Sequence, residues 1–296
     1  MKTVHFDSID FLNRFNQNST YHPLVSVLDF SKTDPRRAHR MVFGVYVVYL
    51  KKVDCGNLIY GKQQYDYQEK TLVFVGPGQS LTATYEGLYQ PRGRAVAFHP
   101  DLLIGTPLAT KIRQYGFFSY HLNEGLHLSE REESIINDCF NKIAYEVEQP
   151  VDKHSRTLVA ANIDLFLQYC ARFYDRQFIT REHVNQSMLV KFDALLTDYL
   201  ASDRTTDYGL PTVAYFAEAL HFSPNYFGDL VKNETGLSAQ DFIQRKIVEV
   251  AKEQLLHQQR SISEIAYGLG YKYPNHFSRT FRRVAGVSPK EFREVG

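Results

Sequence analysis

Hydrophobic residues in the first part of the chain, up to about Leu128, occur in short runs separated by turn-forming residues. The runs are rich in Val, Phe, Tyr and Leu, and proline and glycine stand between them, as in the Pro77-Gly78 pair. Short strands at regular spacing are typical of a small β-barrel or β-sandwich. We therefore predict strands at Leu24–Phe30, Phe43–Lys51, Gly56–Tyr60, Thr71–Gly76 and Arg94–His99.

The hydrophobic spacing changes to that of helices at Ser129. Ser129 and Glu132 form the capping-box pattern of a helix start, and Pro150 is expected to end that helix. A second amphipathic helix is predicted from about His154 to Tyr174. Its large apolar residues are expected largely on one side: Leu158, Leu165, Phe166, Tyr169 and Phe173.

Two consecutive amphipathic helices need an apolar surface to cover their hydrophobic faces. That surface is either the preceding β-domain or the same helices of a second subunit. From Asp175 to Val190 the chain becomes polar, and we place the domain junction there. The predicted fold class is therefore α+β, with a β-domain over 1–128, two helices over 129–180 and an all-α domain over 181–296.

The last ninety or so residues contain an internal repeat. The pattern Pro-Asn-Tyr-Phe at 224–227, with Lys232, Gly236, Ser238 and Phe242, recurs fifty residues on as Pro-Asn-His-Phe with Arg282, Gly286, Ser288 and Phe292. Upstream, at an offset of 49, Val213, Phe216, Ala217, Leu220 and Phe222 match Ile262, Ile265, Ala266, Leu269 and Tyr271. This indicates two copies of one structural unit, with one residue inserted at the turn.

Each copy has the pattern of a helix, a tight turn and a second helix. In the second copy Ser261 and Glu264 form a capping box, Gly270 lies at the turn, and Pro274 suits the first position of a new helix. In the first copy Ser223 is a suitable N-cap for the equivalent helix. A helix that begins directly after such a turn is the one that a helix-turn-helix inserts into the major groove of DNA.

The repeat resembles the DNA-binding domain of the AraC/XylS family of transcription regulators. The resemblance covers residues 210–294 and rests on the segments at 225–236, at 261–266 (Ser-Ile-Ser-Glu-Ile-Ala) and above all at 276–289 (His-Phe-Ser-Arg-Thr-Phe-Arg-Arg-Val-Ala-Gly-Val-Ser-Pro). It implies helix-turn-helix units at about 208–242 and 258–292, joined by a linking helix over Asp241–His257. It also implies a cupin-like sensing domain over 1–128, followed by dimerisation helices over 129–180.

The geometry of a helix-turn-helix and the alignment with the family indicate the same residues for contact with DNA. The candidates for reading bases are Asn225, Gly228 and Asp229 in the first copy and Tyr273, Asn275, His276 and Arg279 in the second. Among these, Asn275 suits adenine, Arg279 suits guanine and Asp229 suits the amino group of cytosine. Contacts with phosphate position a protein on DNA without reading the base sequence. The candidates for such contacts are Ser223, Lys232, Lys272, Arg282 and Arg283.

Charge distinguishes the two copies. Residues 260–296 contain seven Lys or Arg and three acidic residues. Residues 208–246 contain three Lys or Arg and four acidic residues. Neutralisation of phosphates supplies most of the non-specific affinity for DNA. We therefore expect the second copy to dominate the electrostatics and the first to make a weaker contact.

The whole-chain composition is that of a folded protein. The 296 residues are 44% hydrophobic and 23% charged, with a formal net charge of +1, so any basic surface must be local. The N-terminus lacks the apolar core of a signal peptide, and no apolar run approaches the roughly 20 residues of a membrane helix. Cys55, Cys139 and Cys170 are widely spaced, which favours free buried thiols in a reducing cytoplasm over disulfides or a zinc site.

An enzymatic barrel would need residues that this sequence lacks. Metal-binding cupins use a His-x-His pair, and none occurs here; nor is there a G-x-S-x-G, P-loop or Rossmann glycine pattern. We therefore expect no enzymatic activity, metal or cofactor. The remaining roles for the barrel are dimerisation or the binding of a small effector, for which Tyr46, Tyr60 and His99 are candidate ligands.

The expected function is that of a sequence-specific transcription regulator controlled by a small molecule in the barrel. The expected partners are double-stranded promoter DNA, a second copy of the chain, an unidentified effector and, if the protein is an activator, RNA polymerase. Two other interpretations stay open. In one, the barrel is a metal-free cupin enzyme fused to a DNA-binding tail; in the other, it only dimerises or docks another protein.

Overall fold

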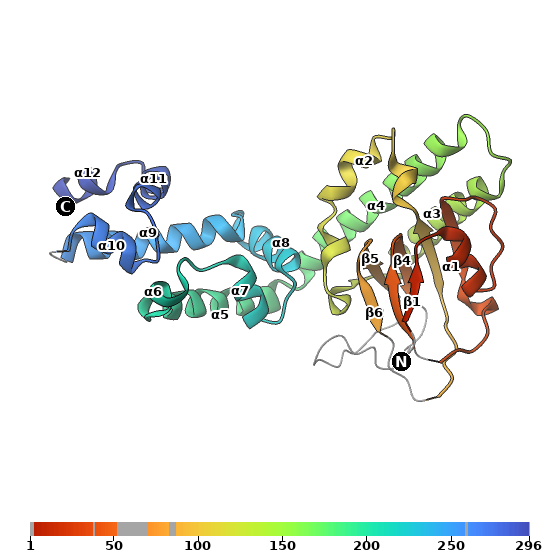
Figure 1. The fold of residues 1–296 in the computed structure, drawn as a ribbon, viewed down its shortest axis with the longest axis horizontal. Coiled ribbons are helices and arrows are strands. Elements are labelled where there is room, and N and C mark those ends of the chain that lie inside the picture. The colour runs from red at the N-terminus through yellow and green to blue at the C-terminus, as the bar shows by residue number, and fades with distance from the viewer. Residues whose placement is uncertain (1–2, 38, 52–69, 83–86, 258–259, 296) are drawn as a thin grey trace. The chain divides into compact units, whose positions relative to one another are not determined.

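The computed structural model describes residues 3–37, 39–51, 70–82, 87–257 and 260–295. The chain divides into two compact units, Met1–Gln177 and Phe178–Gly296. The strands of the described residues all lie in the first unit, and the second unit is built of helices (Figure 1). The predicted α+β class is therefore confirmed.

Two sheets form the first unit. The smaller sheet has the order β1-β3-β6, with β1 parallel to β3, and the larger antiparallel sheet has the order β2-β7-β4-β5-β8. The strand bounds are β1 (Thr3–Phe6), β2 (Val25–Asp29), β3 (Arg40–Phe43), β4 (Tyr46–Lys51), β5 (Thr71–Val75), β6 (Ser80–Thr82), β7 (Arg94–Phe98) and β8 (Leu126–His127). Short helical segments connect and cover them: α1 (Ile9–Phe15), α2 (Leu108–Lys111) and the 3-10 turns η1 (Phe30–Lys32), η2 (Pro100–Leu103), η3 (Ile112–Gln114), η4 (Gly116–Ser119) and η5 (Leu122–Glu124).

The larger sheet is buried on both faces. On one face, Val47, Val73 and Ala95 join residues of the smaller sheet, such as Phe6 and Phe43, in a single hydrophobic cluster. Alternate residues of a strand point to opposite faces. The neighbours of these residues accordingly pack on the other side, where the ring of Phe74 lies 4.4 Å from that of Phe117 and 5.9 Å from that of Tyr174.

The strand predictions were correct for most of the larger sheet but wrong for Phe43–Lys51, which was expected to be one strand. It forms the end of β3 and all of β4, in two different sheets, and the break lies at Gly44. There the N–H of Gly44 donates to the carbonyl of Phe6 at 3.0 Å, and a Cβ on Gly44 would lie 3.0 Å from a carboxylate oxygen of Asp7. The expected strand Gly56–Tyr60 lies outside the described residues.

Two long helices follow the sheets: α3 (Glu130–Glu148) and α4 (Ser155–Thr180). The predicted capping box at the start of α3 is confirmed, because the Ser129 hydroxyl and the Glu132 carboxylate each accept the other's backbone N–H. The Phe140 ring of α3 meets the Phe166 ring of α4 at 5.3 Å. On its other side, Phe140 lies 5.5 Å below the guanidinium of Arg94 in β7, so α3 also covers the larger sheet.

The predicted single apolar side of α4 was wrong. Phe166 and Phe173 are buried within the first unit, whereas Leu158 and Leu165 are 46% and 45% exposed. A turn of helix takes 3.6 residues, so Leu158 and Leu165 lie two turns apart on one face, about 100° from the face of Phe166. The helix therefore has a buried apolar face and a separate exposed one.

The second unit contains eight helices among its described residues: α5 (Glu182–Ala201), α6 (Arg204–Tyr208), α7 (Val213–Ala219), α8 (Pro224–Thr235), α9 (Ala239–His257), α10 (Ile262–Gly268), α11 (Pro274–Ala285) and α12 (Pro289–Val295). They surround two aromatic cores. In the first core, the Phe192 ring of α5 lies 5.1 Å from that of Phe216 and 4.9 Å from that of Phe227. In the second, Phe281 lies 5.8 Å from Phe277 and 5.6 Å from Phe292.

Candidate nucleic-acid interface

The first helix-turn-helix consists of α7, a tight turn and α8. Thr212 caps α7 by accepting the N–H of Tyr215 at 3.2 Å. The turn is closed by a hydrogen bond from the N–H of Phe222 to the carbonyl of Ala217 at 2.8 Å. At its far end α8 stops at Gly236, whose positive φ of 71° suits glycine.

The second helix-turn-helix, α10 and α11, repeats this geometry. The N–H of Tyr271 donates to the carbonyl of Ala266 at 3.0 Å, which is the bond of the first turn moved on by 49 residues. The capping box predicted at Ser261 and Glu264 is confirmed, and α11 begins at Pro274 as expected. The repeat seen in the sequence is therefore a repeat of structure.

Each second helix of a pair buries one face and exposes the other. In α8 the buried side chains include Phe227 and Leu230, and in α11 they include Phe277 and Phe281. The opposite face of α11 carries a row of exposed polar residues: Asn275, His276, Arg279, Arg282 and Arg283. A helix held by its apolar face with a cationic, hydrogen-bonding face toward water is what insertion into a DNA groove requires.

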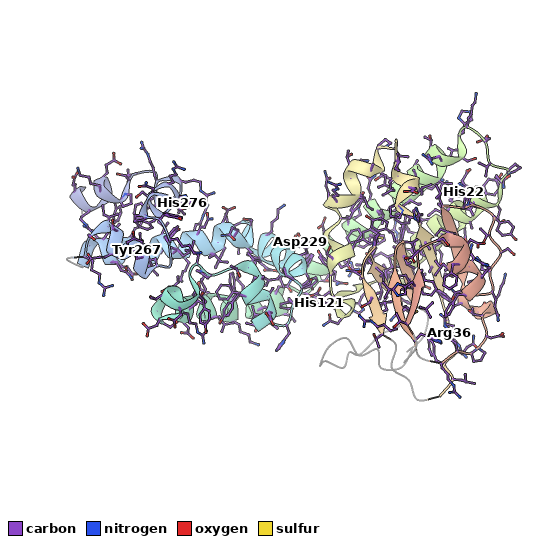
Figure 2. All side chains as sticks on the ribbon, viewed as in Figure 1. His22, Arg36, His121, Asp229, Tyr267 and His276 are labelled. Carbon is purple, nitrogen blue, oxygen red and sulfur yellow. The ribbon has the colours of Figure 1, made fainter. Side chains whose placement is uncertain are left out.

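The candidates near the start of α11 are accessible and close to one another. Tyr273 is 63% exposed, and its ring lies 5.5 Å from that of His276, which is labelled in Figure 2. Asn275 and Arg279 are four residues apart, so they share a face of the helix. Lys272, just before the helix, is also exposed.

The two arginines of the last turn differ in their surroundings. Arg283 lies 3.5 Å from the carboxylate of Asp241, and both side chains are about half exposed. Exposed pairs of this kind contribute about 0–1 kcal/mol, so the pair leaves Arg283 available for a phosphate. Arg282 is exposed, and its carbonyl accepts the N–H of Gly286 that ends the helix.

The candidates in α8 are less uniform. Asn225 and Lys232 are exposed, while Gly228 and Asp229, which is labelled in Figure 2, are half-buried. A Cβ on Gly228 would meet nothing within 4 Å, so its surface is open. Ser223 is only 1% exposed, and its hydroxyl accepts the N–H of Tyr226 at 3.2 Å. Because the cap occupies this buried hydroxyl, the structure does not present Ser223 as a phosphate contact.

Capping also fixes the charge state of two acids in this unit. The N–H of Ser261 donates to Glu264, and the N–H of Ser288 donates to Glu291, each at 2.7 Å. These hydrogen bonds hold the pKa of both carboxyl groups below its usual value. Both acids therefore stay ionised at neutral pH and keep the starts of α10 and α12 formed.

The effector candidates of the first unit that the structure describes, Tyr46 and His99, have different surroundings. The Tyr46 ring stacks on Phe98 at 4.9 Å and contacts Phe118 at 4.9 Å, on the face of the sheet opposite the central cluster. The nitrogen of His99 accepts the N–H of Asp101 and caps η2. Tyr60 lies outside the described residues. A contact between Tyr46 or His99 and an effector stays a prediction.

Tyr49, one of the many tyrosines of the first unit but not one of the three candidate ligands, lies toward the interior. Its ring stacks on that of Phe30 at 5.7 Å and packs against the central cluster. Burial raises the pKa of this phenol. The alternation of β4 could have found it, because positions 46 and 49 lie on opposite faces of a strand.

The described residues give no sign of metal chemistry or of a membrane span. No group of three or more His, Cys, Asp or Glu side chains among them is placed to hold a metal ion. Likewise, none of the helices in the described ranges combines the length and apolar character needed to cross a bilayer.

Comparison with known proteins identifies the C-terminal unit. A family model described as a helix-turn-helix domain matches residues 216–294. The chain is 30% identical over 83 residues to the uncharacterized HTH-type transcriptional regulator YtdP of Bacillus subtilis, a match that covers 28% of this chain and 11% of that protein. It is 26% identical over 153 residues to the HTH-type transcriptional activator RhaS of Escherichia coli, covering 52% of each chain.

The chain thus spans about half the length of RhaS and about a tenth of YtdP. Among solved structures, the C-terminal domain of AraT, a response regulator from Geobacillus stearothermophilus, is 28% identical, with a TM-score of 0.33 over 37% of this chain and 85% of that one. The two relatives YtdP and RhaS are named as an HTH-type transcriptional regulator and an HTH-type transcriptional activator. The C-terminal unit of this chain therefore carries a helix-turn-helix DNA-binding domain of the AraC type.

Proposed function

We propose that this protein is a transcription regulator that binds promoter DNA in a sequence-specific manner through both helix-turn-helix units. The observation that carries the proposal is the exposed face of α11, where Asn275, Arg279 and the last-turn arginines stand opposite a fully buried Phe277 and Phe281. Amide and guanidinium groups near the start of a recognition helix can reach base edges, and the later arginines can reach phosphates.

The two recognition helices have different parts in this proposal. The surplus of cations in the second copy supplies the electrostatic attraction, so α11 is the main anchor. The first copy has Asn225 and Lys232 exposed on α8 but no net positive charge. It therefore adds selectivity more than affinity.

A salt series measures this division directly. Fluorescence anisotropy of the full chain on labelled DNA from upstream of its own gene, beside a shuffled sequence, is expected to show selective binding that weakens steeply with salt. Each lost phosphate contact lowers the slope of log K against log salt by about 0.9. Arg282→Gln is therefore expected to reduce the slope by about one, and Lys232→Gln to reduce it as well. Equal binding to both DNAs at all salt concentrations would contradict the proposal.

We further propose that the protein acts as a homodimer through the exposed apolar face of α4. Leu158 and Leu165 lie two turns apart and remain about half exposed, although Phe166 and Phe173 of the same helix are buried. Joining two such faces would remove apolar surface from water. Leu165→Glu is expected to give monomers in sedimentation velocity and to weaken DNA binding, whereas Val151→Glu, at an exposed site outside the helix, is the control. An unchanged oligomeric state in Leu165→Glu would refute this interface.

Control by a small effector in a cupin-like first unit completes the proposal. A hollow of about 610 Å³ at the edge of β2 and β7 supports it, with Asp29, Lys32 and Arg94 among its lining residues. Such a lining suits a polar, charged molecule rather than an apolar one. The Arg94 guanidinium also donates to the side chain of Asn137 in α3 at 3.2 Å, which links the hollow to the helix that packs against α4.

Thermal shift separates this role from the alternatives. A ligand that binds only the folded protein raises its melting temperature by mass action, whereas a module that only dimerises shows dependence on protein concentration alone. A polar-metabolite screen is expected to give a stabilising ligand whose effect Lys32→Met removes. No stabilisation by any charged metabolite would favour a dimerisation module.

A further inference from the structure

A second cleft lies in the C-terminal unit, apart from the faces proposed to contact DNA. It has a volume of about 420 Å³ and is lined by residues from the end of α5, from α6 and from the start of α7. Its lining residues are Tyr199, Arg204, Tyr208, Leu210, Thr212 and Tyr215, none of which belongs to α8 or α11. The size is that of an ordinary small-molecule site.

The walls of this tyrosine cleft are aromatic and partly open to water. The rings of Tyr199 and Tyr215 meet edge to face at 5.2 Å. Tyr208 is 80% exposed and Leu210 is 38% exposed, so the rim of the cleft exposes apolar surface to solvent. Aromatic rings with polar tips favour flat ligands, which stack on the rings while the hydroxyl groups stay hydrogen-bonded.

The cleft also contains a cation without an acidic partner. A guanidinium nitrogen of Arg204 donates to the hydroxyl of Tyr215 at 2.8 Å, which holds the charge beside the rings. None of the ion pairs formed within the described part of the chain involves Arg204. Its remaining N–H donors match a carboxylate, whose two oxygens can accept two parallel hydrogen bonds from a guanidinium.

The same segment, just before the first helix-turn-helix unit, contacts the second unit. The Tyr199 hydroxyl donates to the carbonyl of Gly209 at 3.1 Å. Next to it, the buried Thr205 hydroxyl donates to the carbonyl of Gly268 in α10 at 2.7 Å. Gly209 and Gly270 approach so closely that a Cβ on Gly270 would lie 2.7 Å from the carbonyl carbon of Gly209. A ligand resting on Tyr199 and Leu210 therefore touches the chain that positions the second unit.

We infer that the tyrosine cleft binds a small planar aromatic carboxylate, and that binding changes the affinity for DNA by shifting one helix-turn-helix unit against the other. The carboxylate pairs with Arg204, and the aromatic ring lies among Tyr199, Tyr208 and Tyr215. The effect on DNA rests on the function proposed above, but the binding of the ligand does not.

Isothermal titration of the full chain with 2-naphthoate tests the binding. The wild type is expected to bind 2-naphthoate and to bind the neutral 2-naphthalenemethanol at least tenfold more weakly. Arg204→Gln keeps a hydrogen-bonding side chain and removes the charge, and it is expected to weaken binding of 2-naphthoate at least tenfold. Tyr208→Ala, at a side chain too exposed to affect folding, is expected to weaken both ligands. Arg245→Gln, an exposed arginine of α9, is the matched control and is expected to bind like the wild type.

Anisotropy on DNA tests the coupling. Saturating 2-naphthoate is expected to change the Kd for DNA by severalfold in the wild type and in Arg245→Gln, but not in Arg204→Gln. If wild-type protein fails to bind 2-naphthoate, or binds the alcohol equally well, the inference is overturned. If instead Arg204→Gln without ligand binds DNA more weakly and with a smaller salt slope, Arg204 is a phosphate contact and the cleft is not a ligand site. If the protein binds 2-naphthoate but no DNA, the proposed function is refuted, whereas the inference that the tyrosine cleft binds an aromatic carboxylate is supported.

Discussion

Gly270 is the glycine of the C-terminal unit at which an added methyl group is expected to destabilise the fold most. Its φ of +90° lies in the left-handed region, where a side chain costs about 1–2 kcal/mol. A Cβ there would also lie 2.7 to 2.9 Å from three backbone atoms of Gly209 and Leu210. Backbone cannot swing aside as a side-chain end can, and overpacking of this kind costs about 1–3 kcal/mol.

Gly270→Ala is therefore expected to lower the free energy of unfolding by about 2–5 kcal/mol. Gly236→Ala is the matched control, because its φ is +71° and a Cβ there would meet nothing within 4 Å. The control should lose only the conformational part, about 1–2 kcal/mol. At roughly 4 °C per kcal/mol for a unit of this size, the expected falls in melting temperature are about 8–20 °C and 4–8 °C.

Differential scanning calorimetry of the full-length variants, with urea unfolding followed by circular dichroism, measures both losses. DNA binding below the transition adds a second readout, because only Gly270→Ala disturbs the contact between α6 and α10. A melting temperature of Gly270→Ala no lower than that of Gly236→Ala would refute the close contact between Gly209 and Gly270.

Two further predictions concern the helix caps. Ser223→Ala is expected to lower the free energy of unfolding by about 1 kcal/mol while leaving the salt dependence of DNA binding unchanged, since its hydroxyl caps α8; a reduced salt slope would instead return Ser223 to the phosphate contacts. Because folding lowers the pKa of Glu264 and Glu291, their contribution to stability is present above the usual value of 4.5 and is lost as the pH falls through the lowered pKa. Glu264→Gln and Glu291→Gln together should therefore destabilise the protein at pH 7 and flatten its acid denaturation below pH 4.5, and a denaturation curve parallel to that of the wild type would contradict this.

The sequence predicted the helix-turn-helix units because their determinants are local. A serine cap, a glycine at the turn and hydrophobic residues at helical spacing act within a few residues of one another, and α10 and α11 begin where Ser261 and Pro274 indicated. The exposed face of α11 followed from the same spacing. Ser223 was assigned a second role that its burial does not allow, and burial depends on packing that no local pattern contains.

The β-domain was harder to predict because its pairings are between distant residues. At the switch of sheets, the N–H of Gly44 bonds to the distant Phe6 carbonyl, and the strands β6 and β8 have only three and two residues, too few to show alternation. The polar stretch after Asp175 is largely helical in the structure, and its buried polar side chains find partners that lie far away in the sequence. Asn185, for example, is buried and donates to the carbonyl of Phe178 at 2.9 Å and to Glu234 at 3.0 Å.

Arg279→Ala is the most direct test of the claim that α11 reads DNA. We would measure anisotropy of the full chain on its selected site and on a variant site in which the contacted guanine is replaced, with Arg245→Ala as the control. A bidentate arginine–guanine pair discriminates by about 1–3 kcal/mol, or roughly 5- to 150-fold. The proposal predicts that Arg279→Ala loses this preference and that Arg245→Ala keeps it. An Arg279→Ala protein that still prefers the original site by the same factor would contradict the proposal.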